Sequence, residues 1–273
     1  MRLSQRPGLC VYHLCAAAWL AASLAVGGCA SLQRPVSRPD SAVTKPPTAD
    51  ELLSRLAQRM DRMQSLRSPY HISYKGQNEK GRFQGAILVH RPDRLRLETL
   101  SLVGAILVLT ANGDQVAVFL PREKVFSRGK TSKENLLRFT RIPLELGELT
   151  SILLGLPPVE LQGSWEREGA ALERRLPQGG RERIGFDPEY ELPLRWDRFS
   201  GGGTNELTAF FSDYITTRIG SFPSKISLHY PSQGRSWEIR YREPDVNVEI
   251  PPPLFVQQTP RRVREVPLDS FGG

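Results

Sequence analysis

The stretch RIPLELGELTSILLGLPP, residues 141–158, decides the fold, because it predicts one apolar helix inside a chain that otherwise alternates like β-sheet. Its apolar side chains recur at helical spacing and form one stripe: Leu146, Leu149, Ile152 and Leu153. Pro143 suits the first turn, Gly155 suits a left-handed helix end, and Pro157 forbids continuation. A helix this apolar needs a concave apolar surface to lie on, so we predict a lid.

Alternating runs on both sides of this helix predict antiparallel strands. The predicted strands span residues 70–75, 83–89, 94–98, 105–110, 115–121, 124–127, 160–167, 171–176, 181–186, 193–199, 207–217, 222–230, 237–241 and 246–250. Asn112-Gly113 between two of these runs is a strong hairpin signal. Meandering strands with two or three helices predict a strongly curved sheet or an open barrel.

Two further helices are predicted before the lid. Thr48, with Glu51 three residues later, has the pattern of a capping box. Leu52, Leu56 and Met60 follow at helical spacing, which predicts an amphipathic helix to about residue 66. Packing on a sheet is the first interpretation of its stripe, and binding of a partner is the alternative. Residues 134–139 predict a brief second helix.

The first 28 residues predict an export signal rather than part of the fold. Arg2 and Arg6 give it a positive start, and the apolar run that follows is too short for a convincing membrane span. The run ends in VGGC at residues 26–29, and small residues before a cysteine are typical of a bacterial lipoprotein signal. An ordinary secretory signal or a short anchor helix is the alternative. We expect Cys29 to carry a diacylglycerol and an N-acyl chain, and we expect no other cofactor.

The remaining cysteines agree with a lipid anchor. Cys10 and Cys15 would leave with the signal, so the mature chain keeps only Cys29 and can form neither an internal disulfide nor a Cys/His metal site. Ala30 follows Cys29, and by resemblance to proteobacterial sorting rules this residue favours the outer membrane. We therefore expect a lipid-anchored protein of the outer membrane that faces the periplasm.

Composition divides the chain into a signal at 1–28, a tether at 29–48, a domain at 49–250 and a Pro/Arg-rich tail at 251–273. The tether is rich in Pro, Ser and Thr and cannot bury a core. We expect the tail to be loose, with Phe255 as a candidate for docking. The formal net charge of +8 becomes +6 without the two signal arginines. This excess of positive charge would favour contact with anionic lipid. Basic residues scattered along the chain are also expected on an ordinary solvated surface, and export argues against binding of nucleic acid.

A loop between two predicted strands, LSLVGA at residues 100–105, is unusually apolar. Loops generally face water. If Leu102 and Val103 lie at the tip, each would gain about 1.5–3 kcal/mol from full burial in a membrane or a partner. The alternative is that the strands are longer than predicted and both residues belong to the core.

Three segments together resemble the LolA/LolB family, the periplasmic carrier and outer-membrane receptor for lipoproteins. They are FQG at 83–85 followed by RLRL at 94–97, LVGA at 102–105, and the stretch 142–157. The last segment and the lipoprotein signal are most similar to the membrane-anchored receptor. The resemblance covers roughly residues 50–250. It implies an unclosed, strongly curved antiparallel β-barrel, mainly β with a few helices, whose helical lid covers an apolar cavity for lipoprotein acyl chains.

The resemblance also implies roles and partners. The family's protruding apolar loop residue, which delivers cargo to the membrane, falls on Val103; the family has Leu after Pro where this chain has Leu102-Val103, so we assign the pair. The implied partners are membrane lipid, lipoprotein acyl chains and a periplasmic LolA-like carrier, and we expect a monomer. The family lacks so long a basic tail, which leaves open a divergent relative with another lipidic cargo.

No catalytic motif is present: the chain lacks Gly-x-Ser-x-Gly, His-Glu-x-x-His and a phosphate-binding glycine loop. His71, His90 and His229 are isolated, and Asp187 near Pro188 indicates a turn. We predict a non-enzyme. The first hypothesis is a receptor that binds acyl chains. The second is a scaffold lipoprotein of the envelope with the same fold and a packed core. The third is an envelope hydrolase, for which the sequence displays no nucleophile and base.

Overall fold

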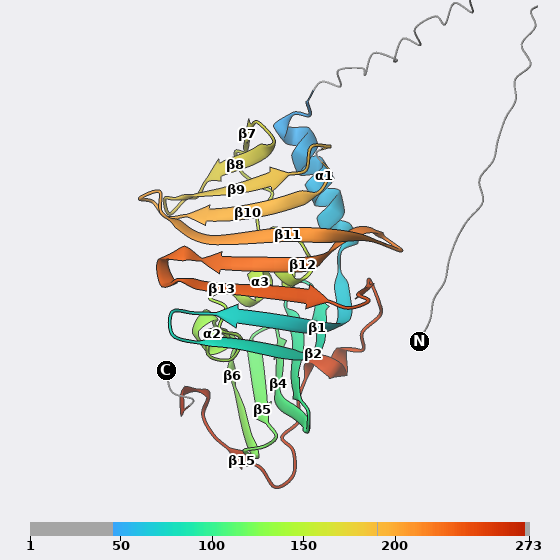
Figure 1. Cartoon of the computed structure of the whole chain (residues 1–273), viewed down its shortest axis with the longest axis vertical. Helices are drawn as coiled ribbons and strands as arrows, with labels where there is room; N and C mark the ends of the chain where they lie inside the picture. The colour runs from blue at the N-terminus through green and yellow to red at the C-terminus, as the bar shows by residue number, and fades with distance from the viewer. Residues whose placement is uncertain (1–45, 190, 271–273) are drawn as a thin grey trace, which may run out of the picture. The chain divides into compact units, whose positions relative to one another are not determined.

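The sheet is assembled from hairpins that follow one another along the chain (Figure 1). The computed structural model describes residues 46–189 and 191–270. Within them the strands are β1 (Ser65–Lys75), β2 (Lys80–His90), β3 (Arg94–Ser101), β4 (Gly104–Asn112), β5 (Gln115–Leu120), β6 (Val125–Lys130), β7 (Glu166–Glu168), β8 (Ala171–Arg175), β9 (Arg181–Phe186), β10 (Pro193–Phe199), β11 (Asn205–Thr217), β12 (Gly220–Tyr230), β13 (Arg235–Tyr241), β14 (Asp245–Val246) and β15 (Arg264–Glu265).

These strands form one sheet whose two ends do not meet. The order across the described sheet is β15-β6-β5-β4-β3-β2-β1-β13-β12-β11-β10-β9-β8-β7, with β14 paired to β1 outside this path. Every described pair is antiparallel except β15 with β6. The helices are α1 (Ala49–Arg62), α2 (Lys133–Thr140) and α3 (Leu146–Leu153). In Figure 1, α1 lies along the β8–β12 part, while α2 and α3 lie behind β13, β1 and β2. The predicted fold class, a curved, unclosed antiparallel sheet with a helical lid, is confirmed.

The first helix begins where the capping box predicts. The Thr48 hydroxyl accepts from the Glu51 N–H at 3.2 Å, and the Glu51 carboxylate accepts from the Thr48 N–H at 2.6 Å. The helix ends at Arg62, whereas the sequence predicted an end near residue 66. The reason lies in Asn247, whose side-chain amide donates to the Arg62 carbonyl and accepts from the Gln64 N–H at 2.8 Å. These bonds close the helix end and let β1 begin.

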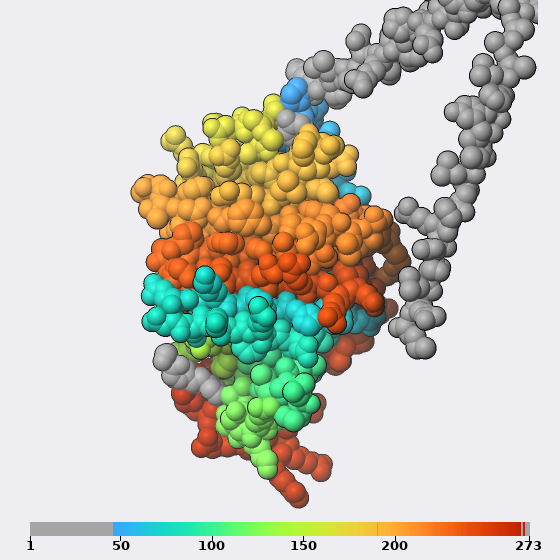
Figure 2. All heavy atoms as spheres, in the orientation of Figure 1, coloured from blue at the N-terminus to red at the C-terminus, as the bar shows by residue number. Residues whose placement is uncertain are grey.

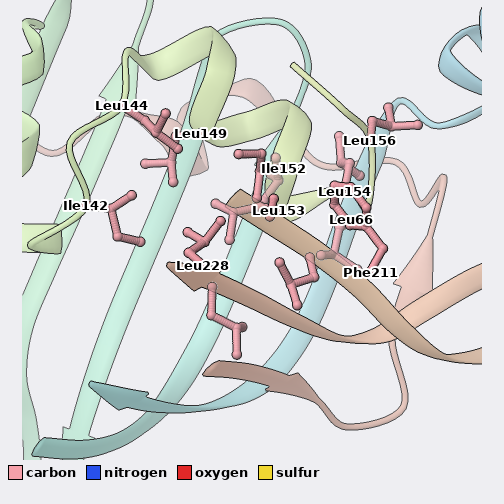
Figure 3. Packing of buried hydrophobic residues seen from close by; sticks show 14 of the residues in the cluster. Leu66, Ile142, Leu144, Leu149, Ile152, Leu153, Leu154, Leu156, Phe211 and Leu228 are labelled. Carbon is pink, nitrogen blue, oxygen red and sulfur yellow. The ribbon is translucent and has the colours of Figure 1, made fainter. Parts of the chain in front are cut away.

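The lid helix also starts later than predicted. Pro143 lies before the helix instead of in its first turn, and Glu145 is the N-cap. The Glu145 N–H donates to the Glu148 carboxylate at 3.1 Å, so this acidic pair sets the start of the helix. Gly155, with φ +71°, provides the predicted left-handed end. Figure 3 shows the leucines of this segment beside Ile142 and above Phe211 and Leu228 of the sheet.

Two predicted strands are much shorter in the structure. The run 160–167 contributes only β7, and the run 246–250 contributes only its first residue, within β14. Asn247 has φ +56°, a left-handed conformation that ends the second run. Trp165 turns inward from the first run and is buried in the core instead of extending the sheet.

The C-terminal tail is packed onto the sheet, so the expectation that it is loose is wrong. Phe255 is buried, as its docking required, and the Gln257 side-chain amide donates to the Ala117 carbonyl at 3.1 Å. β15 pairs with β6, the strand that would otherwise end the sheet with unpaired backbone groups. The tail therefore protects an edge. The segment boundaries drawn from composition stay predictions.

Candidate functional site: an apolar cavity beneath the lid

An apolar cavity of about 290 Å³ lies between the sheet and the two helices α2 and α3. Strands β1–β4 and β13 form the sheet side; their apolar side chains there are Ile72, Phe83, Ile87, Leu95, Leu97, Ile106, Leu107, Trp237 and Ile239. The volume is about twice that of a ~150 Å³ apolar cavity that admits benzene, so roughly a dozen carbon atoms fit. In Figure 2 the strands β1 and β13, which supply part of the lining, face the viewer.

The sheet side of the cavity depends on one close backbone contact. A Cβ atom on Gly85 would lie 1.7 Å from the Glu98 carbonyl oxygen and 3.0 Å from the Tyr70 ring. Only glycine therefore fits at this position of the FQG segment. The Tyr70 ring lies across the space that this glycine leaves, and its hydroxyl is 3.0 Å from the Thr99 hydroxyl. Burial raises the pKa of Tyr70.

The helical side of the cavity uses only part of the predicted stripe. Leu146, Leu149, Ile152 and Leu153 are all buried, but only Leu149 and Leu153 line the cavity. Leu146 and Ile152 pack into the surrounding core. The structure adds Phe139 at the end of α2 and Ile142 in the connection to α3, neither of which was assigned to the site from sequence. A signal existed for Phe139, because it lies three residues after Leu136, another apolar residue of the predicted second helix.

Hydrogen bonds and an ion pair hold α3 at its distance from the sheet. The Thr150 hydroxyl donates to the Pro92 carbonyl at 2.6 Å, and the Tyr241 hydroxyl donates to the Leu153 carbonyl at 2.9 Å. The Leu153 carbonyl needs this partner because Pro157, four residues later, has no N–H. At the start of the helix, Glu148 forms an ion pair with Arg198 of β10. These contacts hold the lid at both ends.

The mouth of the cavity lies between the β1–β2 hairpin and the α2–α3 connection. Glu79, Lys80 and Phe83 line it on the hairpin side, and Arg141 lines it on the helix side. Phe83 is 45% exposed, so the mouth presents an aromatic ring to solvent. The Tyr74 hydroxyl donates to the Glu79 carboxylate at 2.7 Å. The mouth therefore combines apolar and charged side chains.

The predicted loop pair lies at the tip of the β3–β4 hairpin. Leu102 is 102% exposed and Val103 is 82% exposed, so neither belongs to the core. The Ser101 hydroxyl donates to the Gly104 carbonyl at 3.0 Å, and Arg122 donates to the same hydroxyl at 2.8 Å, which ties the base of the tip. The geometry presents two apolar side chains to the outside, and their role in a membrane stays a prediction.

The remaining predictions concern the lipidated cysteine, membrane-spanning helices, metal sites and the turn at Asp187. Cys29 is not among the described residues. Each helix in the described part falls short of the length and apolar content needed to span a membrane. Residues 46–189 and 191–270 hold no group of three His, Cys, Asp or Glu side chains that could bind a metal. The Asp187 carboxylate accepts from the N–H groups of Glu191 and Leu192 at 2.7 and 2.8 Å, which is the predicted turn role.

Comparison with known proteins gives structural matches only. No protein-family model and no curated protein matches the sequence. A domain named for outer-membrane lipoprotein sorting, from Vibrio parahaemolyticus, matches with a TM-score of 0.53 over 74% of this chain and 95% of that one, at 13% identity. A LolA superfamily protein from Nitrosomonas europaea matches with a TM-score of 0.53 over 77% and 98%, at 12% identity.

The chain has the LolA-like fold. A DUF1329 family protein from Desulfovibrio piger shares it, with a TM-score of 0.52 over 75% of this chain and 94% of that one, at 15% identity. The fold that the resemblance of the three sequence segments implied is thereby confirmed. At these identities the LolA-like fold is what is shared, and the activity must be argued from the cavity and the loop.

Proposed function

We propose that this protein is an envelope lipoprotein that binds acyl chains of lipoproteins, or of related lipids, beneath α2 and α3 and helps insert them into the outer membrane. The cavity of about 290 Å³ carries this proposal. Each methylene group removed from water contributes about 0.8 kcal/mol, so a chain of ten carbons gains about 8 kcal/mol before ordering costs. A scaffold protein with this fold would need no such space.

The hairpin tip supplies the step toward the membrane. Leu102 and Val103 are fully exposed on a hairpin whose base is tied, so their burial in a bilayer requires no unfolding. Each contributes up to about 1.5–3 kcal/mol when buried. Acylated Cys29 and the tether after it would keep the domain at the periplasmic side of the outer membrane. A LolA-like carrier in the periplasm is the proposed donor of cargo.

Binding and release in this proposal need no covalent chemistry. The cavity is lined mainly by apolar side chains, and the hydroxyls of Tyr70 and Thr99 on its wall are paired with each other. The acyl chain would enter at the mouth and leave by a small movement of the lid. We propose that the protein acts as a monomeric receptor, not as an enzyme.

The loop gives the sharpest test of delivery. Leu102→Ser/Val103→Ser should fold normally, with the free energy of unfolding within about 0.5 kcal/mol of the parent, because both side chains are exposed. It should load a fluorescent acyl chain normally and transfer it to lipid vesicles at least tenfold more slowly, since each lost side chain costs more than about 1.4 kcal/mol of membrane contact.

A second double variant controls for loss of exposed apolar surface. Leu254→Ser/Val256→Ser removes two side chains exposed by 42% and 47% in the C-terminal tail. This control should transfer the acyl chain at the parental rate. Parental transfer by the loop variant would contradict the proposed role of Leu102 and Val103.

A further inference from the structure

The mouth of the cavity carries unbalanced positive charge. Lys80 lies on the sheet rim and Arg141 lies on the helix rim, and both line the cavity while remaining exposed. Across residues 46–189 and 191–270, no carboxylate is within 4.0 Å of either side-chain cation. Among the described lining residues, Glu79 is the one carboxylate. Two cations against one anion leave a net positive rim.

The surroundings of Tyr74 show that this charge reaches the cavity wall. Burial raises the pKa of Tyr74, and its hydrogen bond to Glu79 raises it further. The positive fields of Arg235 and Arg141 act in the opposite direction. Arg141 therefore lies close enough to act on a group that lines the cavity, and Arg235 adds a third positive charge nearby.

The volume of the cavity limits the apolar part of any ligand whose headgroup meets this positive rim. A volume of about 290 Å³ holds roughly a dozen carbon atoms, which corresponds to one alkyl chain. A chain of this length that fills the cavity would place its headgroup at the mouth. Arg offers a planar fork of donors to carboxylate or phosphate, and Lys offers a mobile point charge.

We propose that the cavity binds a single-chain lipid with an anionic headgroup, a carboxylate or a phosphate, seated between Lys80 and Arg141. This inference rests on the proposed binding of acyl chains and names the class of ligand. The acyl chains of a lipoprotein anchor are joined through neutral ester and amide groups, so they would gain nothing from the two cations. Preference for an anion thus separates the two kinds of cargo.

Three probes with the same alkyl tail test the headgroup: dodecanoate, dodecyl phosphate and dodecanol. They are titrated at low salt, below micelle formation, into the chain from Ala30 onward, which keeps the whole compact unit Pro46–Gly273. Both anions should bind about five- to twentyfold more tightly than dodecanol, because each exposed ion pair contributes about two- to fivefold. The preference should shrink at high salt, since the mouth is open to solvent.

Substitutions test which charged side chains create the preference for anionic headgroups. Lys80→Gln/Arg141→Asn should abolish the preference and leave dodecanol binding unchanged; Asn suits the left-handed backbone of Arg141, which has φ +62°. Lys75→Gln is the matched control, because Lys75 pairs with Lys80 across the β1–β2 hairpin and does not line the cavity. This control should keep the parental preference.

The outcomes separate this inference from the proposed function. Equal binding of all three probes would overturn the anion site and leave acyl-chain binding intact. Failure of all three to bind would overturn the proposed function itself. Loss of the preference in Lys75→Gln would assign the effect to general surface charge and overturn the site. Inorganic phosphate alone should bind at least tenfold more weakly than dodecyl phosphate, and equal affinity would overturn any role for the tail.

Discussion

Side chains alternate between the inner and outer face in both the β1–β4 half and the β8–β12 half of the sheet, but the two halves differ in how completely their inner side chains are buried. In the β8–β12 half, Trp196, Phe211 and Phe222 are completely buried. Under α2 and α3, the β1–β4 half is hollow, and the inward side chains of Ile72 and Leu97 are only partly covered. One pattern of apolar residues therefore builds a solid core in one half and a cavity in the other.

The two helices differ in the polar contacts that accompany their packing. α1 packs on the sheet through buried Leu52 and Leu56, and the Arg59 guanidinium donates to the Ser221 carbonyl at 2.8 Å. α3 also packs through buried leucines, and Thr150, Tyr241 and Glu148 add hydrogen bonds and an ion pair that join it to other parts of the chain. Polar contacts can hold a helix at a set distance from a sheet even where apolar side chains do not fill the space between them. We infer that the hollow half is kept open by these contacts.

The largest expected effect lies in the filled half. Trp196→Ala should lower the free energy of unfolding by about 3–5 kcal/mol, because it removes a fully buried aromatic side chain from β10. Urea denaturation measures the loss, and Trp196→Phe should show a smaller one. Molecules that remain folded should bind an acyl probe as the parent does. A loss below about 1 kcal/mol would contradict a tightly packed half.

A smaller effect is expected where the lid meets the sheet. Tyr241→Phe should cost about 1–3 kcal/mol of stability, because it leaves the buried Leu153 carbonyl without its donor. The measurement is the same denaturation, together with the rate at which an acyl probe leaves the cavity, which should rise. Tyr230→Phe, on the neighbouring strand β12 and only partly buried, should change neither quantity. Unchanged stability and release in Tyr241→Phe would show that this bond does not hold the lid.

Local patterns predicted much of the fold. The capping box at Thr48, the hairpin that turns at Gly113-Asp114 and the left-handed Gly155 depend on a few neighbouring residues, and each occurs in the segment where it was expected. The tail escaped prediction because the edge strand β6 that it covers lies more than a hundred residues earlier. The late start of α3 depends on the competing capping pair Glu145 and Glu148, which sequence reasoning overlooked in favour of Pro143.

The site could be predicted only in part. The stripe of α3 showed that four residues would be buried, but which of them face a cavity depends on the distance between helix and sheet. That distance is set by contacts such as Thr150 with Pro92, which join residues 58 positions apart. Lys80 and Arg141 come from a hairpin and a helix end that only the tertiary fold brings to one mouth.

Lipid that stays bound during purification tests the central claim most directly. The chain from Ala30 onward is expressed with an export signal that leaves no lipid anchor, purified without detergent and examined by native mass spectrometry, beside the cavity-filling variant Ile72→Trp/Leu97→Trp. The parent should carry about one alkyl chain per molecule, in keeping with a cavity for roughly a dozen carbon atoms. The filled variant should have the same circular dichroism spectrum and carry none. An empty parent, or a filled variant that carries as much lipid as the parent, would contradict the account.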